Sequence, residues 1–208
     1  MKLQIAFDMT DLDKALEIAY QVAPFADILE VGTLLIYQHG SQAIQQFKNA
    51  FSKNIIFVDS KIVDRAKNST DIMHTAGADW LSVMAGTSNQ VIHTVCTVAH
   101  ENKQKVILDL LDSNALGQSA MEAKSMGVDM LMLHQASDEL DPSELMDAWE
   151  MVNGNTDLPI FVSAKINRDN IQNVLDIKPA GIIIGRSITN AQNPAVEAEF
   201  YRELCDKG

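Results

Sequence analysis

Short apolar runs recur along the chain at intervals of about 25 residues, which is roughly the length that one βα unit needs. Within each run the apolar residues are consecutive rather than alternating, as in parallel strands that helices cover on both faces. The pattern therefore predicts eight parallel strands. They begin at Leu3, Asp27, Asn54, Asp79, Lys105, Asp129, Pro159 and Gly181.

The residues that lead into four of these runs resemble one another: "FADILEV", "GADWLSV", "GVDMLML" and "PAGIIIG". A small residue, often followed by Asp, precedes the apolar positions, as where a helix ends and a buried strand begins. We interpret this similarity as an internal repeat.

Amphipathic segments with helical periodicity lie between the runs. Thr10 or Asp11 could cap the first of them, and Pro142 stands at a favoured first-turn position of another. The clearest segments are residues 10–23, 41–51, 88–103, 142–152 and 193–204.

Strands and helices that alternate in this way within 208 residues predict an α/β fold, a (β/α)8 TIM barrel that forms a single domain over residues 1–208. A doubly wound open sheet is the alternative. The even spacing of the units, and a first strand that no glycine-rich fingerprint follows, favour the barrel.

Composition and charge narrow the possible partners. The formal net charge is −12, which argues against binding to nucleic acid. No apolar run approaches the ~18 residues of a membrane helix, and the first run, broken by Gln4 and ended by Asp8, is typical of a strand rather than a signal peptide. Cys96 and Cys205 lie too far apart to suggest a disulfide or zinc framework, so we expect a cytoplasmic protein.

Polar residues and glycines stand at or just after the ends of most predicted strands. Each alone has an ordinary explanation as a helix cap, a turn or a solvated side chain. In a barrel, however, the carboxyl ends of all strands meet at one face, where the active sites of barrel enzymes lie. The candidate site residues are Asp8, Glu30, Asp59, Lys61, Asp64, Asp109, His134, Ser163, Lys165, Gly185 and Arg186.

The early strands suggest a metal site and a fixed cation. Glu30 and Asp59 offer hard carboxylate oxygens that suit Mg²⁺. Lys61, between Asp59 and Asp64, would be held charged by its acidic neighbours and could stabilise negative charge on a substrate oxygen.

The later strands add a proton carrier and an anion site. His134 can transfer protons near neutral pH. Gly185 and Arg186 follow the eighth strand, where barrels commonly bind phosphate. Together these features predict an enzyme that forms an enediolate from a sugar phosphate, with a metal that chelates two substrate oxygens.

The stretch "DSKIVD", residues 59–64, matches the Asp-x-Lys-x-x-Asp signature of the orotidine 5′-monophosphate decarboxylase suprafamily. With "EVGT" before it and "GRSIT" after it, nearly the whole chain resembles this suprafamily. Within it, the sequence is similar to the 3-hexulose-6-phosphate synthases and the 3-keto-L-gulonate-6-phosphate decarboxylases.

The resemblance implies roles for the residues of the early strands. Asp8 would contact substrate hydroxyls or the lysine, and Glu30 and Asp59 would lie on the Mg²⁺ side. Lys61 would hold the substrate and its enediolate. Asp64 would reach into the site of a neighbouring subunit, which predicts a homodimer.

For the later strands, the resemblance implies that His134 is the acid or base and that Gly185 and Arg186 hold the phosphate. Asp109 stands where the decarboxylases usually have Glu, and Ser137 where they typically have Arg. We therefore predict an aldol lyase that condenses D-ribulose 5-phosphate with formaldehyde to D-arabino-hex-3-ulose 6-phosphate. A decarboxylase and a non-catalytic homodimer that binds a sugar phosphate are the alternatives.

The sequence departs from the family where phosphate is expected. Ser163-Ala164-Lys165 stands where the family commonly has Gly-Gly, whose backbone amides approach phosphate closely. We expect Lys165 to compensate beside Arg186, because an ammonium can bind phosphate as a point charge. Two further departures are Gln135-Ala136 for Thr-Gly and Arg65-Ala66 for Ala-Gly.

Overall fold

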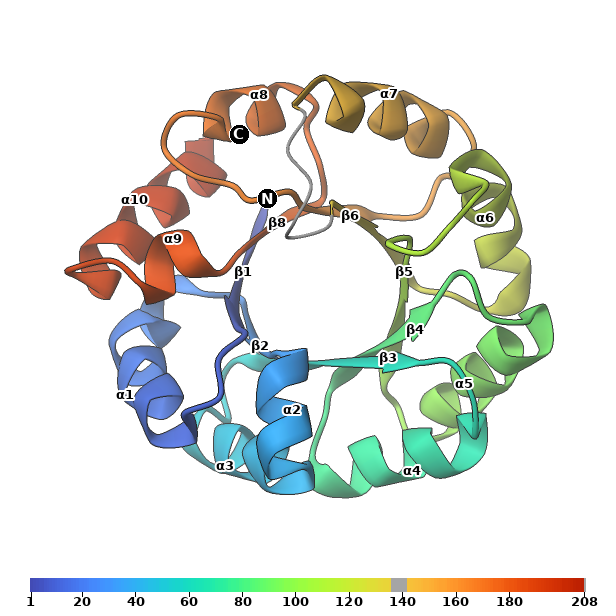
Figure 1. Cartoon of the computed structure of the whole chain (residues 1–208), viewed down its shortest axis with the longest axis horizontal. Helices are drawn as coiled ribbons and strands as arrows, with labels where there is room; N and C mark the ends of the chain where they lie inside the picture. The colour runs from blue at the N-terminus through green and yellow to red at the C-terminus, as the bar shows by residue number, and fades with distance from the viewer. Residues whose placement is uncertain (136–141, 208) are drawn as a thin grey trace.

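The computed structural model describes residues 1–135 and 142–207. Its strands form one closed parallel barrel in sequence order, with the helices as a ring around it (Figure 1), so the predicted fold class is confirmed. The strands are β1 (Lys2–Phe7), β2 (Ile28–Val31), β3 (Ile55–Ile62), β4 (Trp80–Met84), β5 (Lys105–Asp109), β6 (Met130–His134), β7 (Ile160–Ser163) and β8 (Gly181–Ile184).

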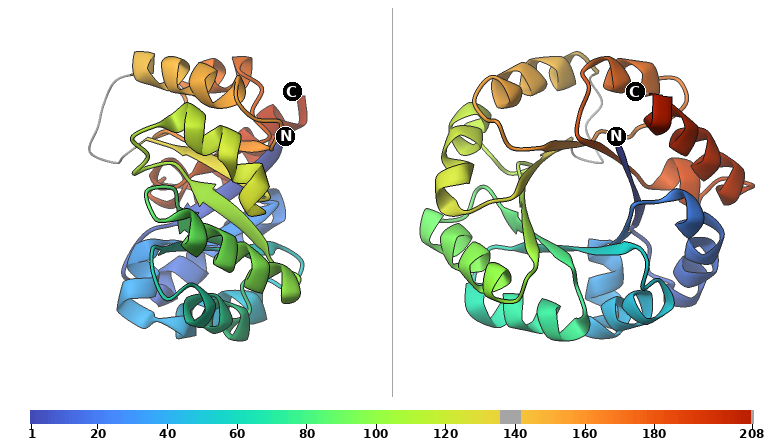
Figure 2. Two further views of the ribbon diagram at one scale, coloured as in Figure 1. Left: turned by 90° about the vertical axis from the view of Figure 1, so that its right-hand side faces the viewer. Right: turned by 180° about the vertical axis from the view of Figure 1, so that it is seen from behind.

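Helices follow the strands and cover the outside of the barrel, as the views in Figure 2 show. All five predicted helical segments are confirmed, and Asp11 caps the first by accepting from the backbone N–H of Lys14. None of the helices in the described ranges is long and apolar enough to cross a bilayer. The α-helices are α1 (Leu12–Val22), α2 (Thr33–His39), α3 (Ser41–Ala50), α4 (Ala66–Ala76), α5 (Asn89–Glu101), α6 (Leu116–Ala123), α7 (Pro142–Asn153), α8 (Ile171–Asp176), α9 (Arg186–Thr189) and α10 (Pro194–Lys207).

Side chains alternate between two cores. On β1, Leu3, Ile5 and Phe7 pack outward against the helices, whereas Ala6 faces the barrel interior. The inner core has one or two such residues on every strand: Ala6, Ile28, Phe57, Trp80, Ile107, Met130, Met132, Phe161 and Ile183.

This alternation explains why the candidate residues meet. Moving two positions along a strand keeps the same face. Each inward column therefore continues, two residues beyond an inner-core member, into a polar residue or a glycine at the carboxyl face. These residues are Asp8, Glu30, Asp59, Ser82, Asp109, His134, Ser163 and Gly185.

The repeated lead-ins have a physical cause at the opposite end of the barrel. In three of the four lead-ins, an Asp before an even-numbered strand accepts the backbone N–H of a residue near the start of the strand before it. A charged acceptor on a buried N–H locks neighbouring strands in register. The pairs are Asp27 with Leu3 (2.9 Å), Asp79 with Ile56 (2.8 Å) and Asp129 with Val106 (2.8 Å).

Asp79→Ala should lower the free energy of unfolding by about 1.5–3 kcal/mol, because it leaves the buried N–H of Ile56 without its charged acceptor. Asp79→Asn, which can still accept, should lose less. The control is Asp157→Ala, which removes an exposed pair with Lys124 that has an Nζ–Oδ2 distance of 2.6 Å and should change stability little. Urea unfolding measures all three variants. Equal losses for Asp79→Ala and Asp157→Ala would show that the contact with the backbone contributes nothing.

Candidate active site

The ends of the inward columns surround a cavity at the carboxyl face of the barrel. Its volume is about 410 Å³, within the range of sites for small molecules. The structure thus brings together most of the predicted site residues. Those that line the cavity are Asp8, Glu30, Asp59, His134, Ser163, Lys165, Gly185 and Arg186.

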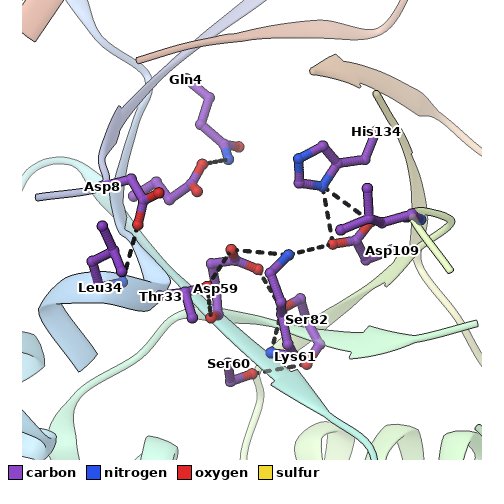
Figure 3. Close-up of polar contacts among 12 residues, drawn as sticks. Gln4, Asp8, Thr33, Leu34, Asp59, Ser60, Lys61, Ser82, Asp109 and His134 are labelled. Atoms are coloured by element: carbon purple, nitrogen blue, oxygen red, sulfur yellow. Dashed lines mark hydrogen bonds and ion pairs between the residues drawn. The ribbon is translucent and has the colours of Figure 1, made fainter. Parts of the chain in front are cut away.

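Lys61 joins two acids beside this cavity (Figure 3). Its Nζ lies 3.2 Å from Asp59 Oδ2 and 2.8 Å from Asp109 Oδ2. Asp59 is therefore an acidic neighbour of Lys61, as predicted. The prediction that Asp64 is the second acidic neighbour is wrong, because Asp64 lies beyond the end of β3. Its side chain is 81% exposed and accepts the backbone N–H of Arg65.

The backbone of β3 explains this choice of partner. The register with β4 shifts between Val58 and Ile62, and Lys61 has a left-handed φ of 44°. The backbone N–H of Lys61 donates to Ser82 Oγ at 2.9 Å. An irregularity of this kind re-aims a side chain, and here it directs the ammonium toward Asp109 on β5.

Asp109 connects Lys61 to His134. Asp109 is fully buried, and His134 Nδ1 lies 3.1 Å from its Oδ2. Burial raises the pKa of Asp109, but the contacts with His134 and Lys61 outweigh this effect and hold the pKa below its ordinary value. Burial opposes charge on Lys61 as well, yet Asp59 and Asp109 raise its pKa. The site therefore keeps an ammonium and a carboxylate charged beside the imidazole.

Glu30 is an acid whose anionic form is disfavoured. Burial, together with the charge of nearby Asp59, raises the pKa of Glu30 to about 8. A hydrogen bond of 2.6 Å from Gln4 Nε2 acts in the opposite direction. A cation beside Glu30 and Asp59 would favour both carboxylates.

The donor set of Glu30 and Asp59 fits a divalent cation that binds together with substrate. Within residues 1–135 and 142–207, no cluster of three or more acidic, histidine or cysteine side chains forms a complete metal cage. Mg²⁺ usually takes one or two protein carboxylates and completes its shell with water and substrate oxygens. Two carboxylates on the wall of one cavity match that requirement.

Three uncharged side chains that we did not predict as site residues hold these acids. Gln4 donates to Glu30, Thr33 Oγ1 donates to Asp59 Oδ2 at 2.8 Å, and Ser82 Oγ donates to Asp59 Oδ1 at 3.0 Å. Gln4 and Ser82 interrupt apolar runs at inward positions, and this sequence signal could have identified them.

Asp8 and Lys165 also have identifiable local structure. Asp8 Oδ1 accepts the backbone N–H of Leu34 at 3.0 Å, so it caps the first turn of α2. Lys165 has a φ of 47°, a conformation that normally favours glycine. The chain therefore keeps a glycine-like backbone where the family resemblance implied glycine. Ala136 and Ser137, two positions of sequence departure, lie outside the described residues.

The fold and the site together define a (β/α)8-barrel enzyme. The model of the orotidine 5′-phosphate decarboxylase / HUMPS family matches residues 1–201 of this chain. The chain therefore belongs to this family, and the resemblance inferred from "DSKIVD" is confirmed.

Individual relatives are similar along the whole chain. A 3-hexulose-6-phosphate synthase of Bacillus subtilis (strain 168) is 26% identical and covers 100% of both sequences. The crystal structure of the 3-hexulose-6-phosphate synthase from Salmonella typhimurium has 26% identity and a TM-score of 0.92, covering 100% of this chain and 99% of that one. The 3-keto-L-gulonate-6-phosphate decarboxylase of Vibrio cholerae has 25% identity and a TM-score of 0.84, covering 99% and 97%.

Proposed function

We propose that the protein is a 3-hexulose-6-phosphate synthase, which condenses D-ribulose 5-phosphate with formaldehyde to D-arabino-hex-3-ulose 6-phosphate. The observation that carries this proposal is the chain of contacts from Asp59 through Lys61 and Asp109 to His134, beside one cavity. Relatives of that name, similar to this chain from end to end, support it.

The proposed reaction begins when C1 of ribulose 5-phosphate loses a proton and an enediolate forms. His134 suits this step because its Nδ1 faces ionised Asp109, so Nδ1 carries the proton and Nε2 can accept one. C1 then attacks the carbon of formaldehyde. The proton on Nε2 passes to the former formaldehyde oxygen, which becomes a hydroxyl.

Lys61 provides a fixed positive charge for the enediolate oxygen. Its two carboxylate partners keep it charged and oriented before substrate arrives. A preorganised charge of this kind stabilises the transition state without reorganisation during the reaction.

We also propose that Glu30 and Asp59 hold Mg²⁺. A divalent cation bound there would draw electron density from two substrate oxygens and so favour the enediolate. Thr33 and Ser82 keep the Asp59 carboxylate oriented toward such a ligand.

The decarboxylase is the second candidate, because the Vibrio cholerae enzyme of that kind has the same fold and both reactions require an enediolate. Asp109, in place of the usual Glu, favours the synthase. The test is to supply Mg²⁺ and ribulose 5-phosphate and follow the loss of formaldehyde, then to supply 3-keto-L-gulonate 6-phosphate and follow CO₂. Inactivity in both assays, with a melting temperature still raised by ribulose 5-phosphate, would favour the non-catalytic binder.

The proposed ligand is a sugar phosphate, and the proposed location is the cytoplasm. Cys96 and Cys205 are buried free thiols, which supports a reducing compartment.

Lys61→Ala should lower kcat by about 10²–10³-fold, the loss typical of a missing oxyanion donor. The matched control is Lys48→Ala, which should keep full activity. Lys48 also forms an ion pair, with an Nζ–Oδ1 distance of 2.6 Å to Asp79, but it does not line the cavity. Formaldehyde consumption gives the rates, and circular dichroism checks the fold. A Lys61→Ala variant that loses stability but keeps its specific activity would make Lys61 a structural residue.

Lys165→Ala should raise the KM for ribulose 5-phosphate about tenfold or more with kcat nearly unchanged, the pattern of lost uniform binding. The control is Lys178→Ala, because Lys178 has a similar φ of 52° but does not line the cavity. Both variants therefore change a left-handed lysine, and Lys165 alone is proposed to contact phosphate. An unchanged KM in Lys165→Ala would exclude this role.

We infer a homodimer in which Asp64 completes the site of the neighbouring subunit. Asp64 is exposed and does not line the cavity of its own chain. Val63, just after β3, and Leu34 and Tyr37 on α2, which follows β2, are exposed large apolar side chains. Such side chains are common at interfaces between subunits.

Asp64→Ala and Lys61→Ala should each be inactive, yet a mixture unfolded and refolded together should regain activity. Random pairing makes about half of the dimers mixed, and each mixed dimer has one intact site of two. The mixture should therefore regain about a quarter of the wild-type activity. Each variant refolded alone is the control. Sedimentation at the assay concentration measures the mass, and a monomer would contradict the shared site.

A further inference from the structure

Gln4 occupies an unexpected place in the barrel. It is fully buried. Its register neighbours are Ile28 on β2 and Ile183 on β8, both members of the inner core. A buried amide among apolar side chains is unfavourable unless hydrogen bonds compensate. Packing would favour an aliphatic side chain, so the amide needs another explanation.

The contacts of the amide point to Glu30. Nε2 of Gln4 donates to Glu30 Oε2 at 2.6 Å, a charge-assisted hydrogen bond when the acid is ionised. Oε1 of Gln4 is buried and has no hydrogen-bond partner among the described residues. Ionised Glu30 therefore sets the orientation of this amide, because the reversed amide would place Oε1 against a carboxylate oxygen.

We propose that Gln4 is a positioning residue that fixes the Glu30 carboxylate for a divalent cation; this inference rests on the proposed function. Glu30 lines the cavity and Gln4 does not, so Gln4 acts through Glu30 rather than on substrate. Loss of a partner that orients a metal ligand typically weakens metal binding about 10- to 100-fold.

Gln104 is a matched control within the same chain. It too is a buried glutamine whose Oε1 has no hydrogen-bond partner in the described part of the chain. Gln104, however, stands just before β5, at the amino end of the barrel, and its Nε2 donates to the backbone carbonyl of Ala78 at 2.8 Å. Replacing Gln104 therefore tests the loss of a buried amide without disturbing Glu30.

The experiment compares the whole protein with its Gln4→Met, Gln4→Asn and Gln104→Met variants. Asparagine keeps an amide but is one methylene shorter, so it should not reach Glu30. Mn²⁺ is the probe, and the free ion is counted by electron paramagnetic resonance with and without ribulose 5-phosphate. Urea unfolding and synthase kinetics are measured on the same samples.

We expect both Gln4 variants to bind Mn²⁺ about tenfold or more weakly, and Gln104→Met to bind it as the wild type does. Wild-type affinity in the Gln4 variants, or an equal loss in Gln104→Met, would overturn the proposal. If Gln4→Met does not fold, Gln4→Asn decides. Wild-type protein that does not bind Mn²⁺ even with ribulose 5-phosphate present would overturn both the cation site and the role of Gln4.

The kinetic measurements separate this inference from the proposed function. If the Gln4 variants bind Mn²⁺ more weakly and Gln104→Met does not, but the protein has no synthase activity, the positioning role of Gln4 is supported and the proposed synthase function is refuted. If the protein is an active synthase and both Gln4 variants keep the wild-type Mn²⁺ affinity, only the positioning role of Gln4 is refuted.

Discussion

The ion pairs of Lys61 with Asp59 and Asp109 are the interactions on which the rest of the site depends. Asp109 is fully buried, and an unpaired charge at such a position would be strongly destabilising. Without the ammonium, Asp59 and Asp109 would lose the cation that they share, and Glu30 near Asp59 would add a third acid. The register shift in β3 and the left-handed φ of Lys61 serve this requirement, because they carry a β3 side chain to an acid on β5. The same charge that makes the acids tolerable is then available to an anionic substrate oxygen.

Acidic residues serve two purposes in this barrel, one at each end of the strands. At the amino end, acids such as Asp79 accept backbone N–H groups and hold neighbouring strands in register. At the carboxyl end, acids such as Asp109 contact other side chains and stay available for chemistry. This division agrees with the general rule that the carboxyl face of a barrel carries function and the other face stability. It also means that substitution of an Asp at a strand end should affect stability or turnover according to the end at which it stands.

The sequence alone predicted the barrel and most of the cavity wall for one reason. Consecutive apolar residues reveal buried parallel strands, and two-residue periodicity then places every strand-end side chain on a known face. The partner of Lys61 could not be predicted in this way. Its contact with Asp109 spans 48 positions and depends on a local irregularity of β3 that the apolar pattern does not encode. Gln4 and Ser82 were overlooked because uncharged side chains within apolar strands attract less attention than acids, although their inward positions made them detectable.

The residues with left-handed backbone share a property other than their conformation. Among the described residues, every non-glycine residue with positive φ is basic: Lys61, Arg65, Lys103, Lys165 and Lys178. Two of them lie between a helix and the next strand, where Gly77 and Gly127 serve the same purpose at other turns. The remaining three lie at the carboxyl face: Lys61 at the end of β3, Arg65 after β3 and Lys165 after β7. A left-handed L-residue costs roughly 1–2 kcal/mol compared with glycine, so turn geometry alone does not favour a lysine there. At the site, Lys61 offsets that cost through two ion pairs. Lys165 has a similar left-handed backbone on the cavity wall, which is where the proposed phosphate would bind.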